Sequence, residues 1–392
     1  MLHGTMPGSG GFLGGGGRSY GVMPLEARAP HDPGVAGRGV WAVVFAGGIG
    51  SRFWPLATPA TPKPVLALVG GRPLVRESVD RLDPLVPADR VLVVTSADIA
   101  EVVRAALPTV PRENVLVEPR PLGTAAALAW GCHEVTRRAG PLAPVCAMHA
   151  DLAAAFPALL QQTVSEAADA STRERALVTV GIRPTRVEPS FGHIEPGDAL
   201  DGGDVADVAR FVEKPGPEAA AALVGDGALW HSGIVVGAAQ EFLDALRLYT
   251  PEVSGGLATL AKGDVAAFGE ATRPIGLERG LLERIGRLLV MTGEFGWDDV
   301  GTWAGLRRCR DLDDDGNGAL GIAHFVDATG NVVHADGGAV VMFGVSHLLV
   351  VTRPGLTFVT TLDRAADLKP LLDSLPGSAR IHPESLRGSG EG

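Results

Sequence analysis

The chain has 392 residues, of which 46% are hydrophobic and 20% are charged. This length and composition predict a globular protein with two domains and exclude an intrinsically disordered chain. The formal net charge of -11 excludes a protein that covers nucleic-acid phosphates with a basic surface, so any phosphate-binding site must be local.

The cysteines and the N-terminal region indicate where the protein works. Cys132, Cys146 and Cys309 show no C-x-x-C spacing, which favours buried thiols over disulfides or a zinc site. Residues 1–38 lack the pattern of a signal peptide, and the chain has no apolar run of about 18 residues. We therefore expect a cytoplasmic protein without a membrane segment, in which residues 1–38 form a disordered tail.

From residue 39 to about residue 303, short β-branched runs alternate with longer, alanine-rich segments of helical period. The strand candidates are 40–46, 91–95, 115–118, 145–149, 177–182, 209–212 and 234–237, and the helical stretches include 124–139 and 217–224. This alternation is typical of βαβ units. We expect an α/β domain over residues 39–310 with a Rossmann-like, doubly wound, mostly parallel sheet.

A polar, glycine-bearing break, DLDDDGNG, follows at residues 311–318. It does not predict a calcium loop, because Ile322 stands where such a loop needs a bidentate glutamate. Short strand candidates without intervening helices then occur at residues 331–335, 339–344, 348–352 and 357–361. They predict a smaller C-terminal β unit, β-helix-like or a sandwich, which ends in one amphipathic helix over residues 364–375. We place this β extension with its helix at residues 318–378.

The most informative segment is residues 42–70, in which a buried strand precedes a glycine-rich turn and two basic side chains. Gly47, Gly48 and Gly50 let backbone N–H groups approach a phosphate chain, because no Cβ atom stands in the way. Arg52 and Lys63 supply positive charge for the same anion. The segment has neither the glycine spacing of a dinucleotide fingerprint nor the G-K-[ST] of a Walker A loop. It therefore predicts a phosphate site of another kind.

The string GGIGSRFWPLATPATPKP in this segment resembles the opening motif of the sugar-phosphate nucleotidyltransferases, roughly G-G-x-G-x-R-x-x-P-L-T followed by P-K-P. FVEKP at 211–215 and LWHSGIVVG at 229–237 resemble later motifs of that family, in the same order. GWDDVGTW at 296–303 and the β tail at 335–361 resemble the mannose-1-phosphate guanylyltransferase branch. The resemblance spans nearly the whole chain. It implies an enzyme that joins GTP to a sugar-1-phosphate and releases pyrophosphate.

The resemblance also implies roles for the residues at matching positions. Nucleotide binding is implied for Gly47, Gly48, Gly50, Arg52, Lys63, Glu118 and Thr124. Substrate binding is implied for Gly192, Glu213, Lys214, His231 and Ser232. Asp151 and Asp299 are implied as ligands of Mg²⁺, and catalysis is implied for Arg52, Lys63, Asp151, Lys214 and Asp299. No covalent nucleophile is needed, because the acceptor's own phosphate attacks the α-phosphorus of the nucleotide.

Four positions depart from the family's motifs beside the predicted substrate site. Leu122 and Gly123 replace the first two residues of R-N-T-A, Leu152 replaces the histidine of A-D-H, and His231 replaces the asparagine of W-N-S-G. A buried hydrogen-bonding site discriminates strongly between hydroxyl patterns. We therefore hypothesise a changed acceptor, for instance a cyclitol such as valienol 1-phosphate in antibiotic biosynthesis.

Alternatives remain open at the level of the sequence. UTP, dTTP or ATP could replace GTP, although the GWDDVGTW motif and the β tail favour GTP. A catalytically silent relative could bind sugar nucleotides and regulate a partner, but it would not need the whole charged set of predicted catalytic residues. In a purely structural interpretation, Asp151 caps a helix, Asp299 lies in a turn and Lys214 is a surface lysine. The β extension is also compatible with a homo-oligomer.

Overall fold

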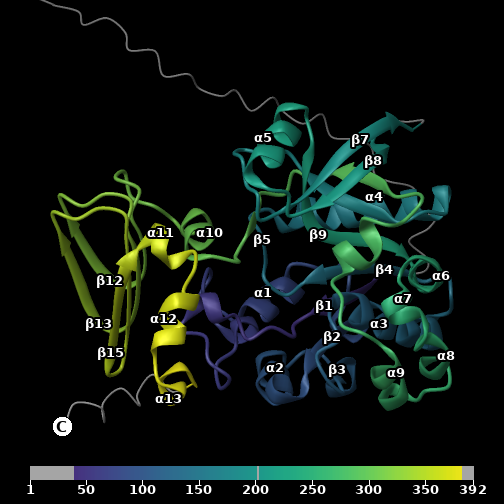
Figure 1. Ribbon diagram of the computed structural model, residues 1–392, viewed down its shortest axis with the longest axis horizontal. Coiled ribbons are helices and arrows are strands. Elements are labelled where there is room, and N and C mark those ends of the chain that lie inside the picture. The colour runs from purple at the N-terminus through teal and green to yellow at the C-terminus, as the bar shows by residue number, and fades with distance from the viewer. Residues whose placement is uncertain (1–38, 201–202, 382–392) are drawn as a thin grey trace, which may run out of the picture. The chain divides into compact units, whose positions relative to one another are not determined.

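The computed structural model describes residues 39–200 and 203–381 (Figure 1). The predicted disordered tail, residues 1–38, lies outside the described residues. The largest sheet has nine strands in the order β3-β2-β1-β4-β9-β6-β10-β8-β7. These strands are β1 (Trp41–Phe45), β2 (Val91–Ser96), β3 (Val115–Glu118), β4 (Pro144–His149), β6 (Val178–Ile182), β7 (Gly192–Ala199), β8 (Val205–Glu213), β9 (Leu229–Ala238) and β10 (Leu289–Thr292).

Helices cover both faces of this sheet, which is the doubly wound α/β arrangement expected from the sequence. Successive residues of a strand point to opposite faces, and in β1 Val44 and Val43 accordingly belong to two different core clusters. The first cluster is covered by α1 (Leu74–Asp80), α2 (Ala100–Ala106) and α4 (Pro157–Glu174), the second by α3 (Thr124–Ala139) and α6 (Ala239–Tyr249). Because both faces are buried, β1 is a continuous apolar run.

Strand direction determines which loops can meet at one edge of the sheet. Strands β3, β2, β1 and β4 run parallel to one another. Beyond them the sheet is mixed, because β9 lies antiparallel between β4 and β6, and β8 lies antiparallel to both β7 and β10. The carboxyl ends of β1, β3 and β4 therefore share one edge, which is where α/β sheets bind ligands.

Shorter elements complete the α/β domain. The remaining helices are α5 (Pro217–Gly225), α7 (Pro251–Ser254), α8 (Leu257–Leu260), α9 (Val265–Ala271) and α10 (Trp303–Arg308). The 3-10 turns are η2 (Ser51–Phe53), η3 (Lys63–Val65), η4 (Ala88–Arg90), η5 (Ala97–Ile99) and η6 (Arg112–Asn114), and η7 (Glu278–Leu282) is a π-helix. No helix in the described part of the chain combines the length and the apolar character needed to cross a bilayer.

A separate four-stranded sheet forms the C-terminal β unit. Its strands are β12 (Gly318–Val326), β13 (Val332–Phe343), β14 (Leu348–Arg353) and β15 (Leu356–Thr361). β12, β13 and β14 stack in parallel, as turns of a β-helix do, and β15 returns antiparallel. The predicted separate strands at 331–335 and 339–344 are wrong, because they form the single strand β13. Its ladder with β12 passes from His334 directly to Ala339, so the glycine-containing segment between them bulges out.

Buried asparagines hold the turns of this β unit together. The side chain of Asn317 donates to the Ala328 carbonyl oxygen at 2.8 Å and accepts from the backbone N–H of Asn331 at 2.9 Å. The Asn331 side-chain oxygen accepts in turn from the backbone N–H of Leu348 at 2.9 Å. Asp313, in the acidic break, accepts from the backbone N–H of Asn317 at 2.7 Å. The acidic break is thus a hydrogen-bonded turn, and it precedes the hydrogen bonds made by Asn317 and Asn331.

The prediction of one closing helix over residues 364–375 is wrong. The structure has three short helices there, α11 (Leu362–Ala365), α12 (Lys369–Ser374) and α13 (Gly377–Ile381). Pro370 lies in the first turn of α12, where its missing N–H is tolerated, but it cannot extend the hydrogen-bond ladder of α11. Pro376 likewise separates α12 from α13.

Arg310 connects the β unit to the α/β domain. Its guanidinium donates to the carbonyl oxygen of Leu68 at 3.0 and 2.9 Å and to that of Val333 at 3.0 Å. The residue is only 8% exposed. Burial lowers the pKa of Arg310 to about 10. One arginine therefore satisfies backbone acceptors on both sides of the junction.

Replacing Arg310 by methionine is expected to lower the free energy of unfolding by roughly 3 kcal/mol, because buried carbonyl groups lose their donors while most of the side-chain volume remains. Urea unfolding followed by tryptophan fluorescence measures the change. Arg247→Met, at an exposed arginine on α6, is the matched control and should change stability by less than about 0.5 kcal/mol. Equal stability of the two variants would contradict the interpretation that Arg310 stabilises the contact between the β unit and the α/β domain.

Candidate active site

The glycine-rich loop after β1 is fixed against Lys63. Gly50 has a φ of 79°, and a Cβ atom at this position would collide with the Lys63 side chain. Glycine is therefore required here. The backbone N–H of Lys63 donates to the Ile49 carbonyl oxygen at 2.8 Å. Gly47 and Gly48 are exposed, and Arg52 follows in η2 with an exposed side chain. The loop thus presents backbone N–H groups and two cations from one short segment.

A two-stranded sheet brings the predicted metal ligands together. β5 (Leu152–Ala154) pairs antiparallel with β11 (Trp297–Asp299), and Leu152 lies opposite Asp299. Asp151 directly precedes Leu152, so the two aspartates become neighbours although they are far apart in the sequence. Leu152 itself is buried and helps to hold the short sheet in place. Asp299 Oδ2 accepts from the backbone N–H of Gly301 at 3.0 Å, and Asp151 forms an ion pair with Lys63.

The two carboxylates have opposite pKa shifts. Burial raises the pKa of Asp151, but the charges of Lys63 and His149 outweigh this effect and place the pKa below its usual range. Burial, and then the negative charge of Asp151, raise the pKa of Asp299. Two such carboxylates are suitable ligands for Mg²⁺, which often binds one or two protein carboxylates together with water and substrate phosphates. Among the described residues, no group of three or more His, Cys, Asp or Glu side chains forms a complete metal site. The pair therefore fits an ion that shares its ligands with a substrate.

Two cavities meet at these charges. One of about 540 Å³ extends over the residues predicted to bind the acceptor, and one of about 300 Å³ lies beside β1 and β3. Lys63, His149 and Asp151 line both. The larger cavity is also lined by Gly50, Arg52, Gly192, Glu213, Lys214, His231, Ser232 and Asp299, and the smaller by Gly47, Gly48, Glu118 and Thr124. The structure thus brings every residue of the predicted site to one continuous region, while the roles of these residues stay predictions.

The smaller cavity contains a buried carboxylate without a hydrogen-bond partner. Glu118 is the last residue of β3 and is 8% exposed, and its Oε1 atom has no partner in the described structure. Burial raises the pKa of Glu118 to about 7, against the opposing effect of the Leu122 backbone N–H. Thr124 begins α3 and accepts from the backbone N–H of Leu277 at 2.8 Å. A ligand that donates hydrogen bonds would satisfy Glu118.

Two of the departures from the family's motifs have structural reasons. Leu122 is 1% exposed and belongs to the core that α3 covers. Gly123 has a φ of 84°, and a Cβ atom there would collide with the Ile275 carbonyl group. The hydrophobic residue and the glycine therefore suit this path of the backbone.

A tight loop holds charged residues at the far end of the larger cavity. Gly192, the first residue of β7, pairs with Glu213, the last residue of β8. Lys214 has a φ of 50°, which is uncommon outside glycine, and its Nζ lies 2.7 Å from Glu213 Oε1. Glu283 Oε1 accepts from the backbone N–H of Glu213 at 2.8 Å, and burial raises the pKa of Glu213. The loop therefore presents a lysine and a carboxylate as one fixed unit.

His231 is a buried, neutral side chain beside this loop. Its Nδ1 lies 3.0 Å from the hydroxyl of Thr179, which also donates to the Ile234 carbonyl oxygen at 3.3 Å. The Thr179 hydroxyl has one hydrogen, so when it donates to Ile234 the Nδ1 atom of His231 is the protonated donor to Thr179, and Nε2 is an acceptor. Burial lowers the pKa of His231 to about 4. The hydroxyl of Ser232 donates to the Val180 carbonyl oxygen at 2.8 Å and so fixes the strand next to His231.

Sequence reasoning missed a second charged pair in the larger cavity. Glu278, in the π-helix η7, lies 3.5 Å from His149 Nε2. Burial raises the pKa of Glu278, but the hydrogen bond and charge of His149 outweigh this and bring the pKa to about 2. The sequence shows no spacing between Glu278 and His149, or between either of them and another residue, that would predict this pair. A π-helix is frequent at functional sites, yet only the structure shows it.

Comparisons with known proteins identify the family of the chain. A family model described as Nucleotidyl transferase matches residues 41–315. Mannose-1-phosphate guanylyltransferase ManC of Salmonella typhimurium is 30% identical over 90% of this chain and 77% of its own length. The alginate biosynthesis protein AlgA of Pseudomonas putida is 28% identical over 88% of this chain and 73% of its own length.

A solved structure extends the similarity to three dimensions. The crystal structure of a protein described as mannose-1-phosphate geranyltransferase from Thermus thermophilus has a TM-score of 0.80 and 30% identity, over 85% of this chain and 98% of that chain. The chain is an enzyme that belongs to the nucleotidyl transferase family, within the branch that contains the mannose-1-phosphate guanylyltransferases.

Proposed function

We propose that this enzyme transfers a guanylyl group from GTP to a sugar-1-phosphate, or to a cyclitol 1-phosphate, and releases pyrophosphate. The observation that carries this proposal is the junction of the two cavities at Lys63 and Asp151. A nucleotide in the smaller cavity and an acceptor in the larger one would both place a phosphate group at this junction. The cytoplasmic location and the homo-oligomer remain predictions.

GTP is favoured by the unpartnered carboxylate oxygen of Glu118. The Watson–Crick edge of guanine offers two neighbouring donors, N1–H and the 2-amino group, and an ionised carboxylate accepts two such hydrogen bonds. Adenine offers one donor beside an acceptor and fits a carboxylate less well. Glu118 lines the same cavity as Gly47 and Gly48, so a base at Glu118 leaves the phosphates beside the glycine loop.

The residues at the junction support an in-line displacement. The acceptor's phosphate oxygen attacks the α-phosphorus, and the bond from that phosphorus to the β-phosphate oxygen breaks. Arg52 and Lys63 place positive charge where the leaving pyrophosphate gains charge, which lowers the barrier electrostatically. Lys214 would bind the acceptor phosphate, and its ion pair with Glu213 keeps it in position.

Mg²⁺ would be held by Asp151 and Asp299 together with phosphate oxygens. Bound there, it would neutralise charge on the two phosphate groups as they approach each other. The Asp299 carboxylate is oriented for this by its hydrogen bond from the Gly301 backbone N–H. Lys63 keeps Asp151 ionised, because its charge lowers the pKa of that carboxyl.

The acceptor ring would lie between Glu213, Glu278 and His231, which all line the larger cavity. Carboxylates and the Nε2 atom of a neutral histidine accept hydrogen bonds, so this wall suits a ring that carries several hydroxyl groups. A histidine where the family's motif has an asparagine offers an acceptor but no second donor at this point. The proposal of a non-mannose acceptor, such as a cyclitol, rests on this difference.

Pyrophosphate release in the presence of Mg²⁺ tests the proposal. GTP, ATP, UTP and dTTP are each combined with mannose 1-phosphate, glucose 1-phosphate and valienol 1-phosphate. We expect release with GTP and one strongly preferred acceptor. Preference for another nucleotide would refute the guanylyl assignment, and mannose 1-phosphate as by far the best acceptor would refute the cyclitol. No release in any well, with GDP-sugar binding intact, would instead favour a silent, regulatory relative.

A further inference from the structure

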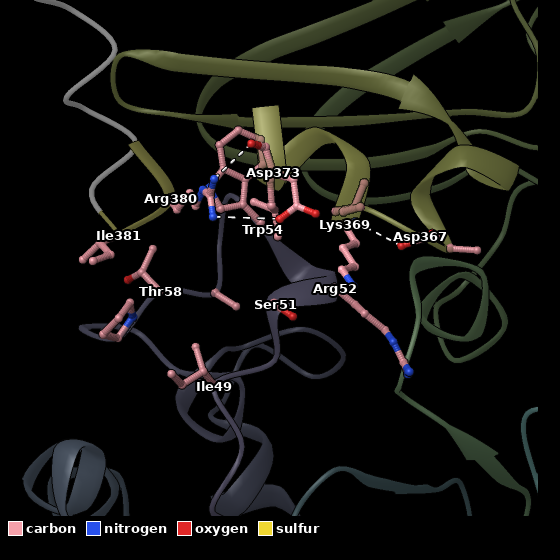
Figure 2. Close-up of a pocket in the computed structure, with 15 residues that line it drawn as sticks. Ile49, Ser51, Arg52, Trp54, Thr58, Asp367, Lys369, Asp373, Arg380 and Ile381 are labelled. Carbon is pink, nitrogen blue, oxygen red and sulfur yellow. Dashed lines mark hydrogen bonds and ion pairs between the residues drawn. The ribbon is translucent and has the colours of Figure 1, made fainter. Parts of the chain in front are cut away.

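A third cavity, of about 480 Å³, lies between the glycine-rich loop and the C-terminal helices (Figure 2). One wall comes from the loop and its continuation, including Ser51, Arg52 and Trp54. The other wall comes from α12 and α13, including Lys369 and Arg380. The C-terminal helices thus reach the segment that the α/β domain uses to approach phosphates.

Two of the five charged residues that line this third cavity are paired with each other. Arg380 donates to the carbonyl oxygens of Asp373 at 3.0 Å and Leu375 at 3.1 Å, and its guanidinium lies 3.9 Å from the Asp373 carboxylate. Asp367 accepts from the backbone N–H of Lys369 at 3.0 Å and not from its ammonium group. Arg380 and Asp373 therefore neutralise each other.

Two cations remain. Within residues 39–200 and 203–381, neither the Lys369 ammonium nor the Arg52 guanidinium has an ion pair or a side-chain hydrogen bond. Both residues are exposed and line the cavity. In Figure 2 the Lys369 side chain points from α12 toward the loop that carries Ser51 and Arg52. The indole N–H of Trp54, whose ring lines the same cavity, is buried without an acceptor. This combination suits an anion that accepts several hydrogen bonds.

Arg52 connects the third cavity to the larger cavity, which contains Asp151 and Asp299 and meets the proposed nucleotide cavity at Lys63 and Asp151. An anion that contacts both Arg52 and Lys369 would therefore extend outward from the predicted site of phosphate chemistry. In the proposed reaction, the group that extends away from the α-phosphorus on the side opposite the acceptor is the pair of β- and γ-phosphates.

We propose that Lys369 is a further substrate-binding residue of this enzyme, which with Arg52 holds the β- and γ-phosphates of the nucleotide and the pyrophosphate they become. The inference rests on the proposed function. When the acceptor oxygen bonds to the α-phosphorus, the bond to the bridging oxygen breaks, and pyrophosphate takes up that electron pair. Lys369 lies where this charge accumulates. The C-terminal extension thereby contributes a residue to the active site.

Lysine is rare in this chain, which allows a well-matched experiment. Its lysines are Lys63, Lys214, Lys262 and Lys369. Lys262 is exposed between α8 and α9 and lines none of the three cavities. Lys262→Met is therefore the control for Lys369→Met, because both variants remove one exposed ammonium group and keep most of the side-chain length.

Lys369→Met should raise the KM for the nucleotide and the inhibition constant of pyrophosphate about tenfold each, as expected for one lost charge-assisted contact. The KM for the acceptor should not change. Lys369→Arg should recover most of the loss, and Lys262→Met should behave like the parent protein. Unchanged constants for nucleotide and pyrophosphate in Lys369→Met would overturn the inference. So would an equal loss in both methionine variants, because it would reflect net charge alone.

Calorimetric titration with magnesium pyrophosphate separates this inference from the proposed function. It needs no acceptor and no turnover. A dissociation constant about tenfold larger in Lys369→Met than in Lys262→Met supports the inference even if the acceptor or the nucleotide proposed above is wrong. Equal dissociation constants overturn it even if GTP is the substrate. Thermal melting of each variant checks that the exposed substitution has not altered folding.

Discussion

Replacing Asp151 by asparagine is expected to lower the rate of pyrophosphate release by about 10³-fold or more, the scale on which a lost electrostatic stabiliser of the transition state acts. The variant keeps the size of the side chain but removes the negative charge that faces Lys63 and Asp299. One carboxylate is then left to hold Mg²⁺, and Lys63 loses its ion-pair partner. The assay is steady-state pyrophosphate release at saturating nucleotide and acceptor.

Asp244→Asn is the matched control for this loss. Asp244 is exposed on α6, pairs with Arg247 at 2.7 Å and lines none of the three cavities. Its substitution should leave the rate within about twofold. Removal of divalent cations with a chelator should abolish activity of the parent protein, and added Mg²⁺ should restore it. A parent-like rate in Asp151→Asn, at unchanged melting temperature, would rule out Asp151 as a ligand of a required ion.

The predictions that agree best with the structure depend on local sequence. The parallel strands around β1 are continuous apolar runs, and buried strands of this kind are identified from composition and length. The conformation of the glycine-rich loop is equally local, since Gly50 and Lys63 belong to one segment and constrain each other. The position of Thr124 at the start of α3 followed from helical period alone.

Contacts between distant segments could not be read in the same way. Glu278 meets His149 through a π-helix and a strand end that no spacing links. The prediction of one closing helix was wrong for a different reason. The apolar residues repeat with helical period, but Pro370 cannot donate the hydrogen bond that a continuous helix needs. Asp151 and Asp299 were paired from resemblance to a family, and the physical cause, the ladder between β5 and β11, appears only in the fold.

Replacing Glu118 by glutamine is expected to lower kcat/KM for GTP by about 10²-fold and to erase most of the preference over ATP. Glutamine presents one acceptor and one donor, so it can pair with only one of guanine's two donors, and its NH₂ group faces the other. The measurement is kcat/KM for each nucleotide at a fixed, saturating acceptor concentration. Glu113→Gln, at an exposed position just before β3, is the control and should leave both values unchanged.

The pH dependence gives an independent test of the same residue. Burial raises the pKa of Glu118 to about 7, so the carboxyl is increasingly protonated as the pH falls through that value. A protonated carboxyl carries its own donor and no longer accepts from both guanine groups. Since kcat/KM reports ionisations of the free enzyme, its value for GTP should rise between about pH 6 and pH 8 and then level off. Glu118→Gln has no group to ionise there and should lose this rise. A rise of the same size in the variant would assign the titration, and the recognition of guanine, to another residue.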